Sequence, residues 1–272
     1  MTDSSPDLGA VFDAAHDEFA VLSPLLWEPI GAATVARSAP QPGERVLDVC
    51  CGAGASALLA AAAVGPDGQV DGIDLADRLL DIGRALASRD GLTQLRFTRA
   101  DATTWAGGPY DVVQCVFGVF FFADMDIGAA HLVGLLRPGG RFVATTWARS
   151  AVKPVPEILV DAMRLEGAPL PSMDDVTPPP ERIETPETFA GWLTGIELHD
   201  VEVTEVPHRV PLDATTAWSI VMGAAMRAML MGLAEDTVAR VRERFVRLLD
   251  EREVTTFDAT TLIGSGRVLR TS

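Results

Sequence analysis

The chain has 272 residues, of which 48% are hydrophobic and 22% charged, a composition typical of a globular protein large enough to bury a core. Its formal net charge of -16 repels a phosphate backbone, so we expect no nucleic-acid substrate. No apolar run predicts a membrane span and the start is too polar for a signal peptide, so we expect a cytoplasmic protein. No cysteine spacing is typical of zinc sites, so we expect no metal.

Two helices are predicted at the beginning of the chain. Residues 11–20 place Phe12, His16 and Phe19 on one helical face, at offsets of three and four. Trp27 follows, and residues 30–39 form the second helix. These aromatic side chains either belong to an ordinary core or line a site, and their periodicity alone does not separate the two.

The sequence VLDVCCGAG at residues 46–54 predicts a ligand-binding loop. A short buried strand at 46–49 breaks into this turn, and an alanine-rich helix at 55–64 follows. Gly52 and Gly54 lack a Cβ, so a ligand can lie close to the backbone where the helix N-terminal N–H groups point outward. The glycine spacing also fits a relaxed dinucleotide fingerprint, which keeps an NAD-dependent oxidoreductase as an alternative.

Asp48 is a carboxylate inside an otherwise apolar strand. Burial of such a group is unfavourable unless the group is hydrogen-bonded or paired, so Asp48 needs a partner. It either ties down the turn or faces a cationic ligand, and the two roles are compatible.

VLDVCCGAG resembles the first motif of class I S-adenosylmethionine-dependent methyltransferases. The resemblance extends from about residue 12 to 267. Within this class, the chain looks nearest to the ubiquinone/menaquinone-biosynthesis type of small-molecule methyltransferase. The chain departs from the family at Cys50, where glycine is usual, and at Phe19, where a tyrosine often stands. The resemblance implies methyl transfer from S-adenosylmethionine to an O-, N- or C-acceptor, a small and largely apolar metabolite of bacterial specialised or quinone metabolism. A second alternative is the same fold and cofactor with a non-methylating rearrangement.

Further cofactor residues are predicted at strand ends. The strand at 69–73 ends at Asp74, which suits the two ribose hydroxyls, although it also precedes a helix at 76–88 and suits a helix cap. The strand at 95–100 precedes Asp101, which by resemblance accepts from the adenine amino group. The full predicted cofactor set is Asp48, Cys50, Gly52, Gly54, Asp74, Leu75, Asp101, Ala102 and Phe117.

The acceptor is predicted to lie among aromatic side chains at the carboxyl edge of the sheet. Strands at 110–117 and 141–147 flank a helix at 127–136 that ends in the loop at 137–140. The predicted acceptor residues are Phe12, Phe19, Trp27, Phe120, Trp147 and Met222. His16 is the candidate general base, because an imidazole is mostly neutral at working pH; the alternative is that it only packs in the cap.

The remainder is predicted to cover the site. Its elements are a helix at 154–166, a proline-rich loop at 167–186, a helix at 186–195, an edge strand at 198–210, helices at 214–233 and 235–253, and a last strand at 260–268. In the resembled family a helical insertion before the last strand forms part of the acceptor pocket.

Together these elements predict an α/β protein. It has a Rossmann-like seven-stranded, mostly parallel sheet with an antiparallel last strand, N-terminal cap helices and a helical lid insertion. We expect one methyltransferase domain over residues 1–272, acting as a monomer or homodimer. Its parts are cap helices at 1–40, a cofactor-binding core at 41–150, the lid, edge strand and insertion at 151–255, and the last strand at 256–272.

Overall fold

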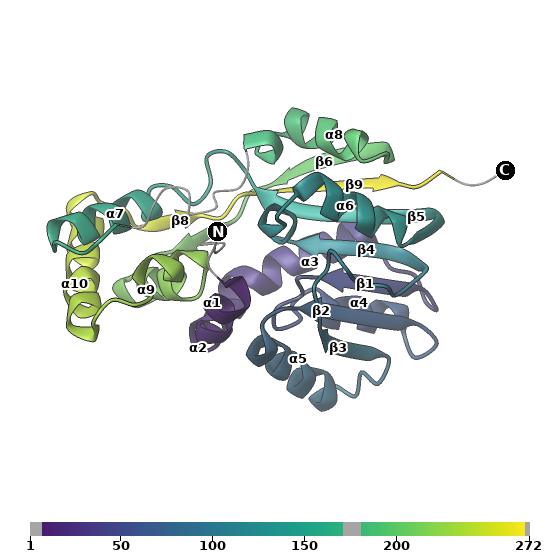
Figure 1. Ribbon diagram of the computed structural model, residues 1–272, viewed down its shortest axis with the longest axis horizontal. Coiled ribbons are helices and arrows are strands. Elements are labelled where there is room, and N and C mark those ends of the chain that lie inside the picture. The colour runs from purple at the N-terminus through teal and green to yellow at the C-terminus, as the bar shows by residue number, and fades with distance from the viewer. Residues whose placement is uncertain (1–6, 171–180, 270–272) are drawn as a thin grey trace, which may run out of the picture.

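The computed structural model describes residues 7–170 and 181–269, and a seven-stranded sheet lies at its centre. The strand order is β3-β2-β1-β4-β5-β9-β6, with β9 antiparallel to both of its neighbours and the first five strands parallel (Figure 1). The strands are β1 Arg45–Val49, β2 Gln69–Asp74, β3 Leu95–Arg99, β4 Tyr110–Val116, β5 Leu136–Trp147, β6 His199–Val206 and β9 Thr261–Arg267. The predicted sheet is confirmed.

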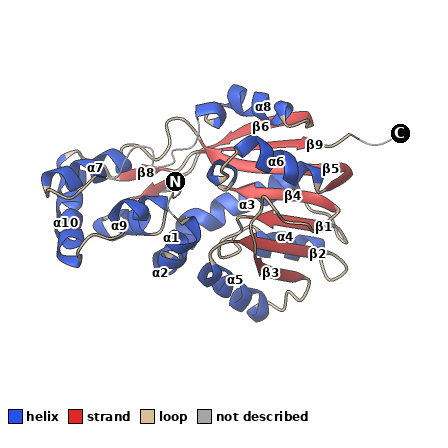
Figure 2. Cartoon of the chain, in the orientation of Figure 1, coloured by secondary structure: helices blue, strands red, loops and turns tan. Residues whose placement is uncertain are grey.

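Helices cover both faces of this sheet, which makes three layers (Figure 2). Alternate residues of a strand point to opposite faces, so Val46 packs under one helical layer and Leu47 under the other, each fully buried. One layer holds α3 Glu28–Ser38, α4 Ala57–Val64 and α5 Asp77–Arg89; the other holds α6 Met125–Gly134 and α8 Pro186–Gly195.

The predicted helix at 11–20 is broken. α1 (Leu8–Ala14) and α2 (His16–Leu22) meet at Ala15, and a π-helix, η1 (Ser23–Trp27), leads into α3. The two parts have different packing partners: α1 contacts α5 and the 3-10 helix η4 (Ala225–Leu230), whereas α2 contacts α9 (Ala214–Met222). Periodicity alone does not detect such a change of partner.

One apolar helical run bears on the expectation that the chain has no membrane span. The 23 residues from His16 to Ser38 are long and apolar enough to cross a membrane, by length and composition alone. Within α3 the residues Ile30 and Thr34 are buried, and the Thr34 hydroxyl lies 2.7 Å from that of Thr145 on β5. The part of the run that forms α3 therefore packs on the sheet, and 28% of the run's most apolar 18-residue window is buried.

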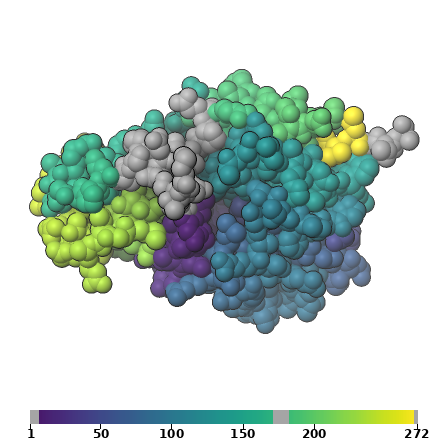
Figure 3. All heavy atoms as spheres, viewed as in Figure 1, coloured from purple at the N-terminus to yellow at the C-terminus, as the bar shows by residue number. Residues whose placement is uncertain are grey.

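The lid is a separate group of elements beside the carboxyl edge of the sheet. Figure 1 shows its helices at one end of the molecule, with α1 and α2 between them and the sheet, and Figure 3 shows the purple N-terminal atoms in the same intermediate place. The lid consists of α7 Val155–Leu165, β7 Arg209–Pro211, α9 Ala214–Met222, the 3-10 helix η4 Ala225–Leu230, α10 Glu235–Glu251 and β8 Thr256–Asp258.

Three predicted elements differ in extent from those in the structure. The edge strand at 198–210 ends at Val206, and the residues beyond it form β7, which pairs with β8 in a two-stranded sheet. The helix at 214–233 ends at Gly223, where an added Cβ would meet Leu22 Cδ1 at 2.8 Å, so the cap packs closely there. The predicted loop at 137–140 lies within β5, with Gly139 at φ 79°.

The proline-rich loop at 167–186 lies partly outside the described residues. Its described end contains a short 3-10 helix, η3 (Glu181–Ile183), before α8. The centre of the predicted loop, residues 178–180, falls in the undescribed segment.

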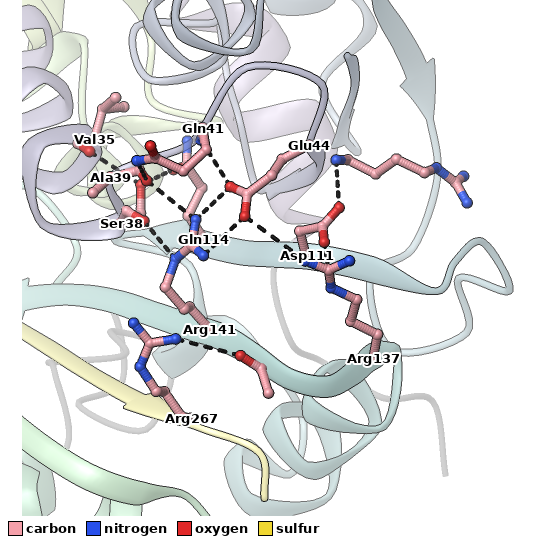
Figure 4. A network of polar contacts seen from close by, with 12 residues as sticks. Val35, Ser38, Ala39, Gln41, Glu44, Asp111, Gln114, Arg137, Arg141 and Arg267 are labelled. Carbon is pink, nitrogen blue, oxygen red and sulfur yellow. Dashed lines mark hydrogen bonds and ion pairs between the residues drawn. The ribbon is translucent and has the colours of Figure 1, made fainter. Parts of the chain in front are cut away.

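A polar network fixes the amino ends of the strands (Figure 4). Arg141 Nη1 donates to Glu44 Oε1 at 3.0 Å and its Nε donates to the Ser38 carbonyl at 2.9 Å. Arg137 pairs with Asp111, which also accepts from the Arg45 amide at 2.7 Å. These charges tie α3 to the sheet at the edge opposite the glycine loop, so they support the fold and leave the carboxyl edge free for a site.

Candidate active site

The predicted cofactor residues come together at the carboxyl ends of four adjacent strands. They follow β1, β2, β3 and β4, which are neighbours in the sheet. Ligands of open α/β sheets bind at such an edge. The Ala100 amide donates to the Asp74 carbonyl at 3.0 Å, which holds the end of β3 beside that of β2.

The glycine loop has the backbone conformation that its sequence predicts. Gly52 has φ 52° and Gly54 has φ 88°, values that side-chain-bearing residues rarely adopt. A Cβ on Gly54 would meet the tip of the Phe97 ring at 2.6 Å, so this position also lacks space for one. Cys50, with φ 54°, adopts the left-handed conformation without being glycine. The substitution of the family's glycine therefore preserves the first bend of the loop.

Asp74 holds the loop directly. Its Oδ2 accepts from the Gly52 amide and its Oδ1 from the Ala76 amide, each at 2.9 Å. Burial raises the pKa of Asp74, while these N–H groups favour its charged form. The loop contact is therefore present, whereas α5 has Ala76 as its N-cap and no side-chain cap bond, so Asp74 holds the turn before the helix. Each carboxylate oxygen keeps a lone pair that is able to accept from a ribose hydroxyl.

Asp48 is fully buried under the start of α4. Its Oδ2 accepts from the Ser56 hydroxyl at 2.6 Å, whereas Oδ1 is buried with no hydrogen-bond partner among the described residues. Burial raises the pKa of Asp48 to about 7, against the hydrogen bond from Ser56. Gln114 lies beside it in the β1–β4 register and was missed by the sequence analysis, although a polar residue in an apolar strand is the same signal that singled out Asp48.

Cys50 lies beside a second cysteine. Its thiol is hydrogen-bonded to that of Cys115 on β4, and a Cβ on Gly118 would lie 2.6 Å from both sulfur atoms. The hydrogen bond with Cys115 and burial raise the pKa of the Cys50 thiol. A protonated thiol is a poor nucleophile, so Cys50 contributes packing at the loop.

The remaining predicted cofactor residues line the same edge. Asp101 is exposed, and its Oδ1 accepts from the amide and hydroxyl of Thr103, at 2.8 and 2.7 Å. Leu75 is 43% exposed, and Ala102 is buried in the core under α6. The exposed position of Asp101 leaves its second oxygen accessible to a ligand.

Four aromatic rings contact one another in sequence between the glycine loop and the lid. Phe19 stacks on Trp27 with ring centroids 4.9 Å apart, Trp27 meets the edge of Phe117 at 6.1 Å, and Phe117 stacks on Trp147 at 4.0 Å. We call Phe19, Trp27, Phe117 and Trp147 the aromatic row. Phe117 and Trp147 pack against both the sheet core and the lid core, so the row lies where the two cores meet.

Other predicted acceptor residues lie beside the row. Phe12 meets the edge of Phe121 at 5.9 Å, and this contact was missed because sequence did not show which phenylalanine of 120–122 faces the cap. Phe120 is buried in the sheet core, and its place in the acceptor wall stays a prediction. Met222 is half-buried at the end of α9, and its carbonyl accepts from Arg227 at 3.3 Å.

His16 is half-buried at the start of α2. Its Nδ1 lies 2.9 Å from the Asp13 carbonyl, and its Nε2 lies 3.4 Å from Asp17 Oδ1. Both contacts are with residues of the cap itself. The structure therefore shows how the ring is held, while its role as a base stays a prediction.

The comparisons with known proteins follow this geometry. The sequence model of the ubiE/COQ5 methyltransferase family matches residues 12–158, just over half of the chain. The matched segment contains the glycine loop, Asp74, Asp101 and the whole aromatic row. The chain belongs to this family. It is an S-adenosylmethionine-dependent methyltransferase, so the predicted family, cofactor and enzyme class are confirmed. The oxidoreductase alternative is not favoured.

Two relatives have names that describe small-molecule chemistry. The chain is 33% identical over 150 residues to aklanonic acid methyltransferase DauC of Streptomyces sp. strain C5, which covers 54% of this chain and 68% of that protein. It is 34% identical over 140 residues to nocamycin O-methyltransferase of Saccharothrix syringae, covering 51% of this chain but about half, 48%, of that protein.

The whole fold has a match among solved structures. The [4+2]-cyclase SpnF superposes with a TM-score of 0.62 over 98% of both chains, at 18% identity. An identity this low establishes the shared fold alone.

Proposed function

We propose that this methyltransferase transfers its methyl group to a small, largely apolar metabolite. The observation that carries the proposal is the aromatic row, which extends from the glycine loop to the lid and places four apolar rings beside the predicted cofactor residues. The two named relatives support the same substrate class through their own acceptors.

The glycine loop and its acids fit the cofactor. Gly52 and Gly54 leave room against the backbone, Asp74 lies at the end of β2, and the unpaired Oδ1 of Asp48 is a buried acceptor behind the loop. We propose that these residues, with Cys50, Leu75, Asp101, Ala102 and Phe117, hold the cofactor. When bound, S-adenosylmethionine supplies an electrophilic methyl group.

The chain's own contribution to the reaction is position and exclusion of water. Holding a nucleophile about 3 Å from the transferred group supplies much of the acceleration of such a displacement. The cap helices and the lid enclose the aromatic row, and His16 is the proposed base for an acceptor that must lose a proton. We also propose that residues 1–272 act as one domain, in the cytoplasm, as a monomer or homodimer.

The test uses candidate acceptors with isotopically labelled S-adenosylmethionine, followed by mass spectrometry. A gain of one labelled methyl group on an apolar ring compound is the expected result. Calorimetry with S-adenosylmethionine, S-adenosylhomocysteine and NAD gives an independent measure of ligand choice. Tight NAD binding without any response to S-adenosylmethionine would overturn the proposal, while cofactor binding with a rearranged, unmethylated product would favour the non-methylating alternative.

A further inference from the structure

Trp27 is carried by an unusual piece of backbone. It ends the π-helix η1, in which the Glu28 amide donates to the Ser23 carbonyl. Single π turns are rare and occur frequently at functional sites. His208 Nε2 donates to the Leu25 carbonyl at 2.7 Å, which anchors the same turn to the segment between β6 and β7. The π turn is thus held by its own backbone bond and by His208, and these two bonds fix the position of Trp27.

The indole N–H of Trp27 donates no hydrogen bond within the described part of the protein. Its Nε1 is buried and has no hydrogen-bond partner among residues 7–170 and 181–269. Buried tryptophan N–H groups usually find a partner, because a buried donor without one has lost its hydrogen bond to water. Two other tryptophans follow this rule: Trp105 donates to the Tyr110 hydroxyl at 3.0 Å and Trp192 to Asp126 at 2.8 Å.

The ring that carries this donor lies between two other rings of the candidate site. On one side it stacks on Phe19, whose ring lies against Gly52 of the cofactor loop. On the other side it meets Phe117 at the end of β4, and through it Trp147. Trp27 is therefore in the middle of the aromatic row, in surroundings that are otherwise apolar.

We propose that Trp27 determines specificity by donating its indole N–H to an oxygen atom of the bound molecule, and that this oxygen belongs to the acceptor. An indole nitrogen donates and never accepts, so its partner must be an acceptor atom such as a ketone, enolate or phenolate oxygen. The methylated substrate is then a ring compound that carries such an oxygen. This inference rests on the proposed function, because it describes the acceptor of that reaction.

A cofactor oxygen is the other possible source of the same chemistry. The position of Phe19 argues against it, because that ring lies between Trp27 and the glycine loop. A site built to bond an oxygen also discriminates strongly against an analogue that lacks it, because the buried donor is then left unpaired. 1-Tetralone has a carbonyl oxygen, and tetralin has nearly the same shape without one. Comparing the two probes therefore tests whether the Trp27 N–H serves an oxygen of the acceptor or one of the cofactor.

The first measurement is atom-specific. The protein is labelled with ¹⁵N-tryptophan, which gives one indole resonance for each of its five tryptophans, and Trp27→Phe identifies the resonance of Trp27. With S-adenosylhomocysteine saturating, 1-tetralone should move the Trp27 indole proton downfield, tetralin should not, and the bonded Trp105 and Trp192 resonances should stay in place. A Trp27 resonance that 1-tetralone leaves unmoved, or moves no more than tetralin does, would overturn the proposal.

The second measurement is the affinity of each probe. The parent should bind 1-tetralone more tightly than tetralin, and Trp27→Phe, which keeps a stacking ring, should lose about three- to tenfold of that preference. Trp147→Phe is the matched control, because it alters the same aromatic row but keeps the Trp27 donor. An equal preference in parent and Trp27→Phe, or no preference in the parent, contradicts the assignment.

Affinity for S-adenosylmethionine, measured on the same proteins, identifies the source of the oxygen. Unchanged cofactor affinity in Trp27→Phe is expected. If the variant instead weakens cofactor binding and keeps its preference for 1-tetralone, the N–H serves the cofactor and the assignment to the acceptor is wrong. Failure of the proposed function itself is distinguishable, because it appears in the parent as absent cofactor binding or absent methyl transfer.

Discussion

The ring of Phe19 lies against the backbone of Gly52: a Cβ atom at Gly52 would be 3.1 Å from the tip of that ring. On its other side the Gly52 amide donates to Asp74 at 2.9 Å. Gly52 therefore contacts both the cap helix and the end of β2. A substitution at Gly52 should disturb the cap as well as the predicted cofactor residues.

Gly52→Ala should weaken cofactor binding and modestly destabilise the fold. The new methyl group presses on Phe19, and φ 52° is unfavourable for alanine by about 1–2 kcal/mol. We expect the affinity for S-adenosylmethionine, measured by calorimetry, to fall at least tenfold while the protein stays folded.

Gly91→Ala is the matched control for this change. Gly91 has φ 68°, also a positive value, but a Cβ there would meet nothing within 4 Å. It should show a similar loss in the free energy of unfolding and an unaltered cofactor affinity. If the two variants bind the cofactor equally well, the contact of Phe19 with the loop has no part in binding.

Asp74→Ala should lower cofactor affinity by about 10- to 150-fold. Charge-assisted hydrogen bonds to the ribose are worth about 1.5–3 kcal/mol each, and the variant removes the carboxylate that would accept them. Asp77→Ala, an exposed acid in the first turn of α5, is the control and should bind as the parent does. A folded Asp74→Ala protein with parental affinity would show that Asp74 only braces the loop and the turn before α5.

Stability should decrease with rising pH across the range in which Asp48 differs between the folded and unfolded states. Its pKa is raised from 3.8 to about 7 by burial, so between these values the folded protein holds a proton that the unfolded chain has lost. The free energy of unfolding then falls by at most about 1.4 kcal/mol per pH unit from this group. Below about pH 4 and above about pH 7 the contribution of Asp48 is flat.

Asp48→Asn isolates that contribution, because its neutral side chain has nearly the same shape. Chemical denaturation of parent and variant between pH 4 and 8 should show a difference in stability that grows in favour of Asn as the pH rises. A constant difference over this range would mean that Asp48 is ionised in the folded protein throughout.

The base hypothesis for His16 predicts a loss of about 10²- to 10⁴-fold in the single-turnover rate of His16→Ala at saturating cofactor and acceptor. Partial recovery should occur at alkaline pH, where the acceptor ionises without help. The contacts of His16 with Asp13 and Asp17 are also consistent with a role confined to the cap. A rate within a few-fold of the parent, with the same pH profile, would establish that role and leave proximity as the mechanism.

The sequence alone determined the sheet and the cofactor edge. Apolar runs identified the strands, and glycine at positions 52 and 54 identified a turn with positive φ, because these are local properties of the backbone. Asp74 was predicted for the same reason, since the acid at the end of the second parallel strand must lie beside the loop that follows the first.

Only the tertiary structure decided which side chains meet in the cap and the lid. Phe120 and Phe121 are adjacent and chemically identical in sequence, yet the first is buried in the sheet core and the second contacts Phe12. The helix break at Ala15 accompanies the contact of α1 with α5, and the helix end at Gly223 accompanies its close approach to Leu22 of α2. In both cases the two contacting segments are far apart in the sequence. The unpaired N–H of Trp27 is likewise visible only after packing has removed it from water, because burial and hydrogen-bond satisfaction depend on every neighbour in space and no sequence pattern encodes them locally.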